Sequence, residues 1–305
     1  MRRRSLLKAL GGTAIGAAAS TPAPKPASGR IRLAIRTVAY QGYPMAEAAR
    51  RIRQAGFEGV QLGLRFADAR LDLAAPDWGF ARRARETFGE AGLRVAGLDG
   101  YTNLVHPDPA ARERGLRGLA LLLEHAGEFG TRVVATESGT FRPGQRWNPH
   151  PENPAAGWKL FVETLEILLD SAETGDSLLA LEGSIIQYIG TVEAVRRLLE
   201  TVPSPRLKIL WDPSNYFDET RLERMTELLR AMSETFGAHV VLCHAKDVRP
   251  APDGKVEWVA AGEGRLDYAE FFRLLDGLGR EIFVALEYVR EPEAGRVKRY
   301  VEGFL

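Results

Sequence analysis

Eight short apolar runs recur along the chain, and each is followed by a stretch with the periodicity of an amphipathic helix. The helical stretches, such as "PMAEAARRIRQAG" and "LDYAEFFRLLDGLG", carry apolar residues at three- and four-residue spacing and often close with glycine. The apolar runs are predicted to be β-strands and cover residues 31–40, 59–64, 93–100, 131–139, 177–184, 207–215, 239–247 and 281–289.

This alternation sets the fold class. Eight strand–helix units in about 275 residues match the size of a (β/α)₈ barrel. The runs are almost continuously apolar, as expected of parallel strands that are covered on both faces. A doubly wound open sheet is the rival, but "VAYQGYPMAEA" after the first strand lacks the G-x-G-x-x-G turn of such folds. We therefore predict an α/β protein with a single (β/α)₈ TIM barrel over residues 31–305.

The residues before the barrel have a different character. "RRSLLK" (Arg3 to Lys8) precedes a short run of small apolar residues, and together they resemble a twin-arginine export signal. The alternative is a basic disordered tail. The run is too short to span a bilayer. We predict a signal peptide at residues 1–19, a Pro/Ala-rich linker at 20–30, and an exported, periplasmic protein with no stable membrane insertion after cleavage.

The charge balance bears on the class of partner. Residues 1–19 contain four basic residues and no acidic one, so their removal leaves 37 Lys and Arg against 40 Asp and Glu. A slightly acidic chain is a poor match for nucleic acid or an anionic membrane. Cys243 is the only cysteine, which excludes an internal disulfide and is predicted to be a buried apolar residue. The sequence leaves open whether the chain forms a homo-oligomer.

Polar residues end four consecutive predicted strands. They are spaced by 30, 32 and 43 residues, close to one strand–helix repeat each, with the longer last gap assigned to a loop over residues 248–264. In a parallel barrel the carboxyl ends of the strands meet at one rim, which is where active sites form. The four residues are Glu182, Asp212, His244 and Glu287.

Three carboxylates and one imidazole at one rim favour a metal site. Crowded carboxylates repel and raise one another's pKa, and a divalent cation relieves that repulsion. A set of three oxygens and one nitrogen fits Mn²⁺ best, with Mg²⁺ and Co²⁺ as alternatives and Zn²⁺ less suited. A single polar strand end is more often without function, but four in matching register favour one divalent ion.

Several motifs together resemble the xylose isomerase-like TIM-barrel superfamily, which includes sugar phosphate isomerases and epimerases. They are "ALEG", "WDPSN", "CHAKD", "GEGRLDYAEFFRLLDGLG" and "VALEY". The resemblance covers about residues 31–305 and implies that Glu182, Asp212, His244 and Glu287 bind the metal. It also implies that Glu182 and Glu287 are catalytic, removing and returning a proton beside the carbonyl of a small carbohydrate through an enediolate.

Three more residues near these motifs are candidates. Lys246 is predicted to be catalytic by holding a substrate oxygen or stabilising the enediolate; alternatively it forms a salt bridge with Asp247. Asn215 stands where family members often carry histidine, and it is predicted to bind a substrate hydroxyl. Arg249 is the only candidate for an arginine that some ketose epimerases carry after the ligand histidine.

The remaining candidates follow the fourth strand. Glu137 ends that strand and is predicted to bind substrate, or else to pair with Arg142. Trp147 and His150 lie in the polar, proline-rich stretch 146–154. Such loops often close over a site and stack an aromatic ring on a sugar, although a proline-rich loop can also be merely rigid.

The resemblance leaves more than one function open. The preferred one is a metal-dependent sugar isomerase or epimerase. The runner-up is a lyase or dehydratase acting on a keto-sugar or keto-glycoside, in which the same enolate expels a β-leaving group. A third is a non-catalytic sugar-binding protein. The apurinic endonuclease branch is disfavoured, because it needs a histidine-rich trinuclear zinc site and this chain has only five histidines, none of them at the ends of the second and third strands. No phosphate-binding pattern stands out.

Overall fold

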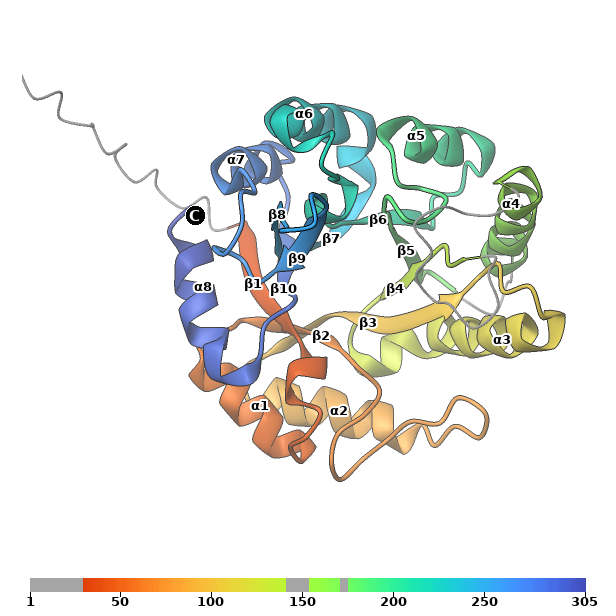
Figure 1. Cartoon of the computed structure of the whole chain (residues 1–305). Coiled ribbons are helices and arrows are strands. Elements are labelled where there is room, and N and C mark those ends of the chain that lie inside the picture. Colours follow the sequence, from red (N-terminus) through yellow and green to blue (C-terminus); the bar gives the residue numbers. More distant parts are fainter. Residues whose placement is uncertain (1–29, 141–153, 171–174) are drawn as a thin grey trace, which may run out of the picture.

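The strands close into a ring, because β1 (Ile31–Arg36) pairs in parallel with both β2 (Gly59–Leu62) and β10 (Ile282–Leu286). The computed structural model describes residues 30–140, 154–170 and 175–305 (Figure 1). The order around the closed barrel is β1-β10-β7-β6-β5-β4-β3-β2. The other barrel strands are β3 (Arg94–Asn103), β4 (Val133–Glu137), β5 (Leu178–Glu182), β6 (Leu207–Trp211) and β7 (Val240–Ala245).

Helices lie outside this ring of strands (Figure 1). Several begin at a side chain that satisfies a free backbone N–H of the first turn. Asp108 accepts from Ala110 N before α3, and Thr191 accepts from Ala194 N before α5. The helices are α1 (Met45–Gln54), α2 (Gly79–Glu90), α3 (Pro109–His125), α4 (Pro154–Asp170), α5 (Val192–Thr201), α6 (Met225–Phe236), α7 (Tyr268–Gly277) and α8 (Ala294–Glu302). The predicted (β/α)₈ barrel is therefore confirmed.

The apolar residues form two packed layers. The larger one joins the strands to the helices, and a small one of residues such as Ala180, Leu210 and Leu242 joins strands β3 to β7. Phe283 of β10 packs against this small layer. Gly59 makes room for that ring, because a Cβ at this position would lie 2.5 Å from Phe283 Cε1. The strands are thus held by a filled barrel rather than an open channel.

One predicted loop is instead a β-hairpin. Residues 248–264 were expected to be irregular, but β8 (Asp247–Pro250) and β9 (Val256–Val259) pair in antiparallel register within this region. The hairpin follows β7 directly and lies inside the ring of helices in the view of Figure 1. The short turn "PDGK" between the two strands carries Gly254 with a φ of 81°, which a side chain would disfavour. The eighth strand of the barrel is therefore β10.

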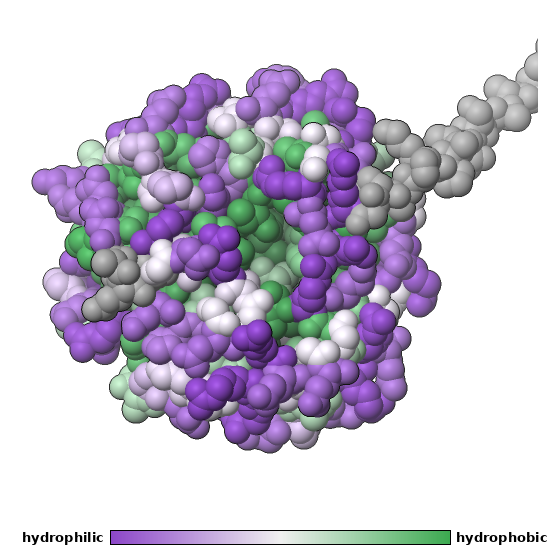
Figure 2. Space-filling view, turned by 180° about the vertical axis from the view of Figure 1, so that it is seen from behind, coloured by the Kyte–Doolittle hydropathy of each residue, from purple (hydrophilic) through white to green (hydrophobic). Residues whose placement is uncertain are grey.

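Figure 2 shows the opposite face, where hydrophilic side chains cover most of the rim and hydrophobic ones show between them towards the centre. Within the described part of the chain, no helix has both the length and the hydrophobicity that crossing a membrane requires. The predicted signal peptide and nearly all of the linker lie outside the described residues.

Candidate metal centre

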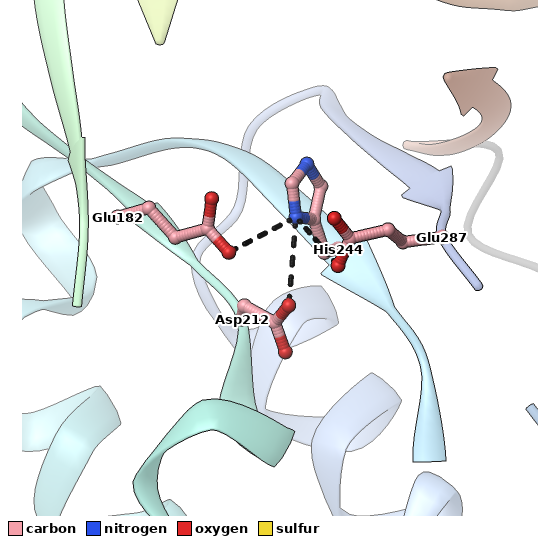
Figure 3. Close-up of side chains that lie close together, drawn as sticks. All are labelled: Glu182, Asp212, His244 and Glu287. Carbon is pink, nitrogen blue, oxygen red and sulfur yellow. Dashed lines mark ion pairs between the residues drawn. The ribbon is translucent and has the colours of Figure 1, made fainter. Parts of the chain in front are cut away.

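Four side chains from adjacent strands converge at the carboxyl rim of the barrel (Figure 3). Glu182 is the last residue of β5, and Asp212 directly follows β6. His244 lies near the end of β7, and Glu287 directly follows β10. One potential ligand atom from each lies within 4.8 Å of the others. The barrel therefore brings together the four residues that the strand ends predicted.

The imidazole of His244 sits at the centre of this cluster. Its Nδ1 lies 3.4 Å from Glu182 Oε1, 3.5 Å from Asp212 Oδ2 and 3.6 Å from Glu287 Oε2. The ring is fully buried, and Nδ1 has no hydrogen-bond partner among the described residues. Donors that share one metal at about 2.1 Å lie about 3.0–3.5 Å apart, so the spacing fits a common cation. A buried nitrogen without a partner is costly unless a ligand occupies it.

A glutamine fixes which nitrogen of His244 carries its proton. Gln61 of β2 has its Oε1 2.7 Å from His244 Nε2 and donates from its Nε2 to Asp99 Oδ1 at 2.6 Å. Because a carboxylate only accepts, the amide nitrogen faces Asp99 and the amide oxygen accepts from His244 Nε2. That hydrogen bond leaves Nδ1 facing the carboxylates, where a bound metal would take the place of its proton, as in metal-binding histidines. Neither Gln61 nor Asp99 was predicted from the sequence.

Two buried cations balance the carboxylates. Lys246 Nζ donates to Glu287 Oε2 at 2.7 Å and lies 2.9 Å from Asp212 Oδ2. Arg36, the last residue of β1, donates to Glu287 Oε1 and, at 3.0 Å, to Asp99 Oδ2. Arg36 was not predicted from the sequence, although its place at a strand end was a usable signal.

The alternative role considered for Lys246, a salt bridge with Asp247, is wrong. Asp247 instead accepts from three backbone N–H groups, those of Val248 at 2.9 Å, Leu266 at 2.8 Å and Gly262 at 3.1 Å. Successive residues of an extended chain point to opposite sides, so Lys246 faces the rim and Asp247 the adjoining loop. Asp247 thus fastens the segment after β9 to the barrel.

The charges of the cluster fit one divalent cation. With a neutral imidazole, four carboxylates and two cations leave a net charge of −2, which a single +2 ion cancels. The cations are Arg36 and Lys246. The carboxylates are Glu182, Asp212, Glu287 and Asp99. The residues present therefore fit a divalent metal, with oxygen ligands in excess as Mn²⁺ and Mg²⁺ prefer.

Carboxylate crowding was expected to raise pKa values, and among Glu182, Asp212 and Glu287 the pKa is raised for Asp212 alone. Burial raises the pKa of Asp212, and the charge of Lys246 offsets that effect only in part. Burial also acts on Glu182 and Glu287, but neighbouring cations outweigh it and lower both pKa values, that of Glu182 to about 2. Burial would lower the pKa of His244, yet Glu182 and Glu287 raise it to about 9.

Two uncharged side chains donate hydrogen bonds to the carboxylate of Glu182. Asn215 Nδ2 donates to Glu182 Oε1 at 2.7 Å, and Tyr101 Oη donates to Glu182 Oε2 at 2.5 Å. Asn215 was predicted to bind a substrate hydroxyl, and the structure places it in the site, bonded to a candidate ligand. Tyr101 of β3 was not predicted, although it lies in the polar stretch "LDGYTN" that ends this strand.

A cavity of ≈ 120 Å³ opens above the cluster. It is lined by Glu182, Glu287, Lys246 and Arg36, and also by Tyr101, Asn215, Trp258 and Tyr288. Trp258 was not predicted, because it lies on β9, in a segment that was expected to be a loop. A larger hollow of ≈ 570 Å³ lies between α3 and α4, and none of the four clustered residues line it. The charged side chains that line the smaller cavity, rather than the cavity volume, therefore identify the candidate site.

The other predicted substrate-binding residues are not brought to this cavity. Glu137 is buried at the end of β4 and accepts from Gln187 Nε2 at 2.9 Å. Arg249 of β8 points to the surface and pairs with Glu257 Oε1 at 2.6 Å. Trp147 and His150 lie outside the described residues.

Comparison with known proteins agrees with the fold. A 3-keto-D-glucoside 4-epimerase from E. coli shares 18% identity, covering 89% of this chain and 99% of its own, with a TM-score of 0.68. An L-ribulose 3-epimerase shares 15% identity over 90% and 94%, with a TM-score of 0.66. A xylose isomerase-like TIM barrel protein from Mycobacterium smegmatis in complex with magnesium shares 19% over 90% and 98%, with a TM-score of 0.64.

No curated protein matches the chain. At the identities found, the structural similarities establish the fold and leave the substrate to be argued from the site. The sequence model of one family, described as the xylose isomerase-like TIM barrel, matches residues 49–304. That match begins within α1 and extends past α8, and it includes all four clustered side chains. This chain belongs to the xylose isomerase-like TIM barrel family.

Proposed function

We propose that this protein is a divalent-metal-dependent sugar isomerase or epimerase that acts beside a carbonyl group. The observation that carries the proposal is the buried Nδ1 of His244, which faces three carboxylate oxygens at 3.4 to 3.6 Å beneath an open cavity. Structural neighbours that are named as sugar epimerases, and one in complex with magnesium, support the same kind of chemistry.

When bound, the metal would supply positive charge that polarises a substrate carbonyl and acidifies the neighbouring C–H. Mn²⁺ is the preferred ion, with Mg²⁺, Co²⁺ and Zn²⁺ as alternatives, and Glu182, Asp212, His244 and Glu287 would hold it. Glu182 and Glu287 both line the cavity, from strands at the two ends of this group of four. One would take the proton and the other return it on the opposite face of the substrate's enediolate.

Lys246 and Asn215 are suited to orient the substrate. An ammonium has three N–H donors, and Glu287 and Asp212 engage two of those of Lys246. The third can donate to a substrate oxygen in the cavity that Lys246 lines. Asn215 lines the same cavity, and its amide oxygen can accept from a hydroxyl group.

The test is proton NMR in D₂O of the protein with keto-sugars and 3-keto-glycosides. The protein is loaded with Mn²⁺ and then exchanged into Mg²⁺ for the spectra. Metal-dependent deuterium beside the carbonyl is expected, and it should disappear in the metal-stripped protein and in Glu287→Gln. An epimerised product supports the proposal, whereas an eliminated aglycone replaces it with a lyase. Binding of these sugars without any exchange would instead indicate a sugar-binding protein.

Export is a separate proposal, resting on "RRSLLK" and the apolar run that follows it. Residues 1–19 would direct the folded protein through the twin-arginine route, so the sugar would be met in the periplasm. Mass spectrometry of the periplasmic protein should give an N-terminus at Ser20. Replacement of Arg3 and Arg4 by lysine should retain the protein in the cytoplasm, and unchanged secretion of that variant would contradict the route.

A further inference from the structure

Tyr288 adopts a backbone conformation that is rare for an aromatic residue. Its φ of 57° lies in the left-handed region, and Tyr288 is the only described residue other than glycine with a positive φ. In an extended chain, Glu287 and the residue after it would point to opposite sides. The left-handed turn allows both side chains to line the same cavity. A strained backbone of this kind persists only where the surrounding structure holds the residue in place, and such residues cluster at functional sites.

A second aromatic ring reaches the cavity from the hairpin. Trp258 of β9 donates from Nε1 to the Ser214 carbonyl oxygen at 3.1 Å, which fixes the orientation of its indole. The rings of Tyr288 and Trp258 both lie close to one ammonium, because Lys246 Nζ is 5.0 Å and 5.5 Å from their centroids. Tyr288 remains 52% exposed. The cavity thus has aromatic surface that the metal chemistry does not explain.

The charges of the cavity bear on the substrate. Among the described residues that line it, the only cations are Arg36 and Lys246. Both already bind carboxylates, Arg36 those of Glu287 and Asp99, and Lys246 those of Glu287 and Asp212. A phosphate dianion is bound best where positive charge exceeds the negative charge of the neighbouring carboxylates. The described part of the cavity therefore offers a phosphorylated substrate no counter-ion of its own.

We propose that Trp258 and Tyr288 form an aromatic wall that selects an uncharged sugar in its ring form. The C–H bonds on one face of a pyranose ring are weakly positive and apolar, and they match the negative face of an aromatic ring. The hydroxyl edge of the sugar would then point to Lys246 and Asn215. This inference rests on the proposed function and adds the substrate class, namely a neutral pyranoside rather than an open-chain or phosphorylated sugar.

Binding of unreactive probes tests the wall without requiring turnover. Isothermal titration of the Mg²⁺-loaded protein compares methyl glucopyranoside, methyl galactopyranoside, methyl mannopyranoside and methyl xylopyranoside, each with its alditol. None of these probes has a carbonyl group. At least one pyranoside should bind about tenfold more tightly than its alditol, and its 6-phosphate, where one exists, should bind about tenfold less tightly than the parent. The ring protons of the bound pyranoside should also shift upfield in NMR spectra.

Variants separate recognition from folding. Tyr288→Gly removes the ring and also the steric cost of the left-handed backbone, so the melting temperature should be kept while the preference for the ring form is lost. Trp258→Leu should lose the same preference. Tyr300→Leu is the control, because Tyr300 is a partly exposed aromatic residue on α8 that does not line the cavity. Tyr300→Leu should bind each pyranoside and its alditol with the same affinities as the unaltered protein.

The outcomes distinguish this inference from the proposed function. Equal affinity for each pyranoside and its alditol, tighter binding of the phosphate, or an unchanged preference in both aromatic variants would overturn the aromatic wall. Deuterium exchange on keto-sugars could still occur in that case. Conversely, selective pyranoside binding by a protein that exchanges no deuterium would support the aromatic wall and would contradict the proposed isomerase or epimerase activity.

Discussion

Lys246 Nζ lies 2.9 Å from Asp212 Oδ2, which is the same oxygen that faces His244 Nδ1 at 3.5 Å. The ammonium also binds Glu287 Oε2 at 2.7 Å, again the oxygen that faces the imidazole. A metal held by this cluster would therefore share two carboxylate oxygens with a buried lysine. The lysine neutralises the carboxylates and, by the same charge, repels an incoming cation.

Replacing Lys246 by methionine should therefore tighten metal binding. Loss of the competing positive charge is expected to increase the affinity for Mn²⁺ about tenfold or more, measured by isothermal titration. The variant should melt at a lower temperature in EDTA, because its carboxylates lose a partner. Lys298→Met is the matched control, since Lys298 is also buried but pairs with Glu302 on α8. Equal or weaker Mn²⁺ affinity in Lys246→Met would contradict this account.

Gln61 should matter for metal affinity without contacting the metal. Gln61→Leu removes the acceptor of His244 Nε2–H, so the imidazole loses the hydrogen bond that orients it. Loss of such a partner typically weakens metal binding about 10- to 100-fold. Gln187→Leu provides the comparison, because this buried glutamine bonds Glu137 and touches none of the four ligands. If both variants bind Mn²⁺ like the unaltered protein, the orienting role is wrong.

Metal should stabilise the folded chain. A divalent ion that binds only the folded state, at a hundred times its Kd, adds about 2.7 kcal/mol to the free energy of unfolding. For a domain of this size that corresponds to about 5 °C in Tm. Calorimetry in EDTA and in MnCl₂ measures the shift. Asp212→Asn should remove most of it, and a Tm that is the same with and without metal would argue against the site.

A carboxylate far from the cluster gives a pH prediction. Glu270 of α7 accepts from Arg273 at 2.6 and 2.7 Å and from Arg230 of α6 at 2.6 Å. The bonds from Arg273, aided by Arg230, outweigh burial and lower the pKa of Glu270 from 4.5 to about 2. Because the folded pKa is the lower one, this stabilisation is complete above about pH 5 and is lost as pH falls towards 2.

Urea unfolding of the protein and of Glu270→Gln at several pH values measures that contribution. The difference in unfolding free energy between them should be largest near neutral pH and should shrink below about pH 5. A difference that stays constant down to about pH 3 would show that Glu270 acts through packing rather than through its charge.

The cluster of four side chains was predictable because its signal is local. Each of Glu182, Asp212, His244 and Glu287 ends its own apolar run, and a parallel barrel places all such ends at one rim. The partners of these residues were not predictable in this way. Gln61 carries no pattern that distinguishes it from other polar residues in strands. Arg36 ends its strand, but the carboxylates that it binds lie on other strands and are brought to it only by closure of the barrel.

Periodicity and strand ends, both properties of short stretches, determined the (β/α)₈ fold and the four clustered side chains. Only the tertiary structure decided which cations neutralise them, which residue orients His244, and that a hairpin carries Trp258 to the cavity. The bond from Arg36 to Glu287 joins positions 251 residues apart and exists because β1 closes against β10. Ring closure is a property of the whole chain, so contacts across it are set by packing and charge between distant segments.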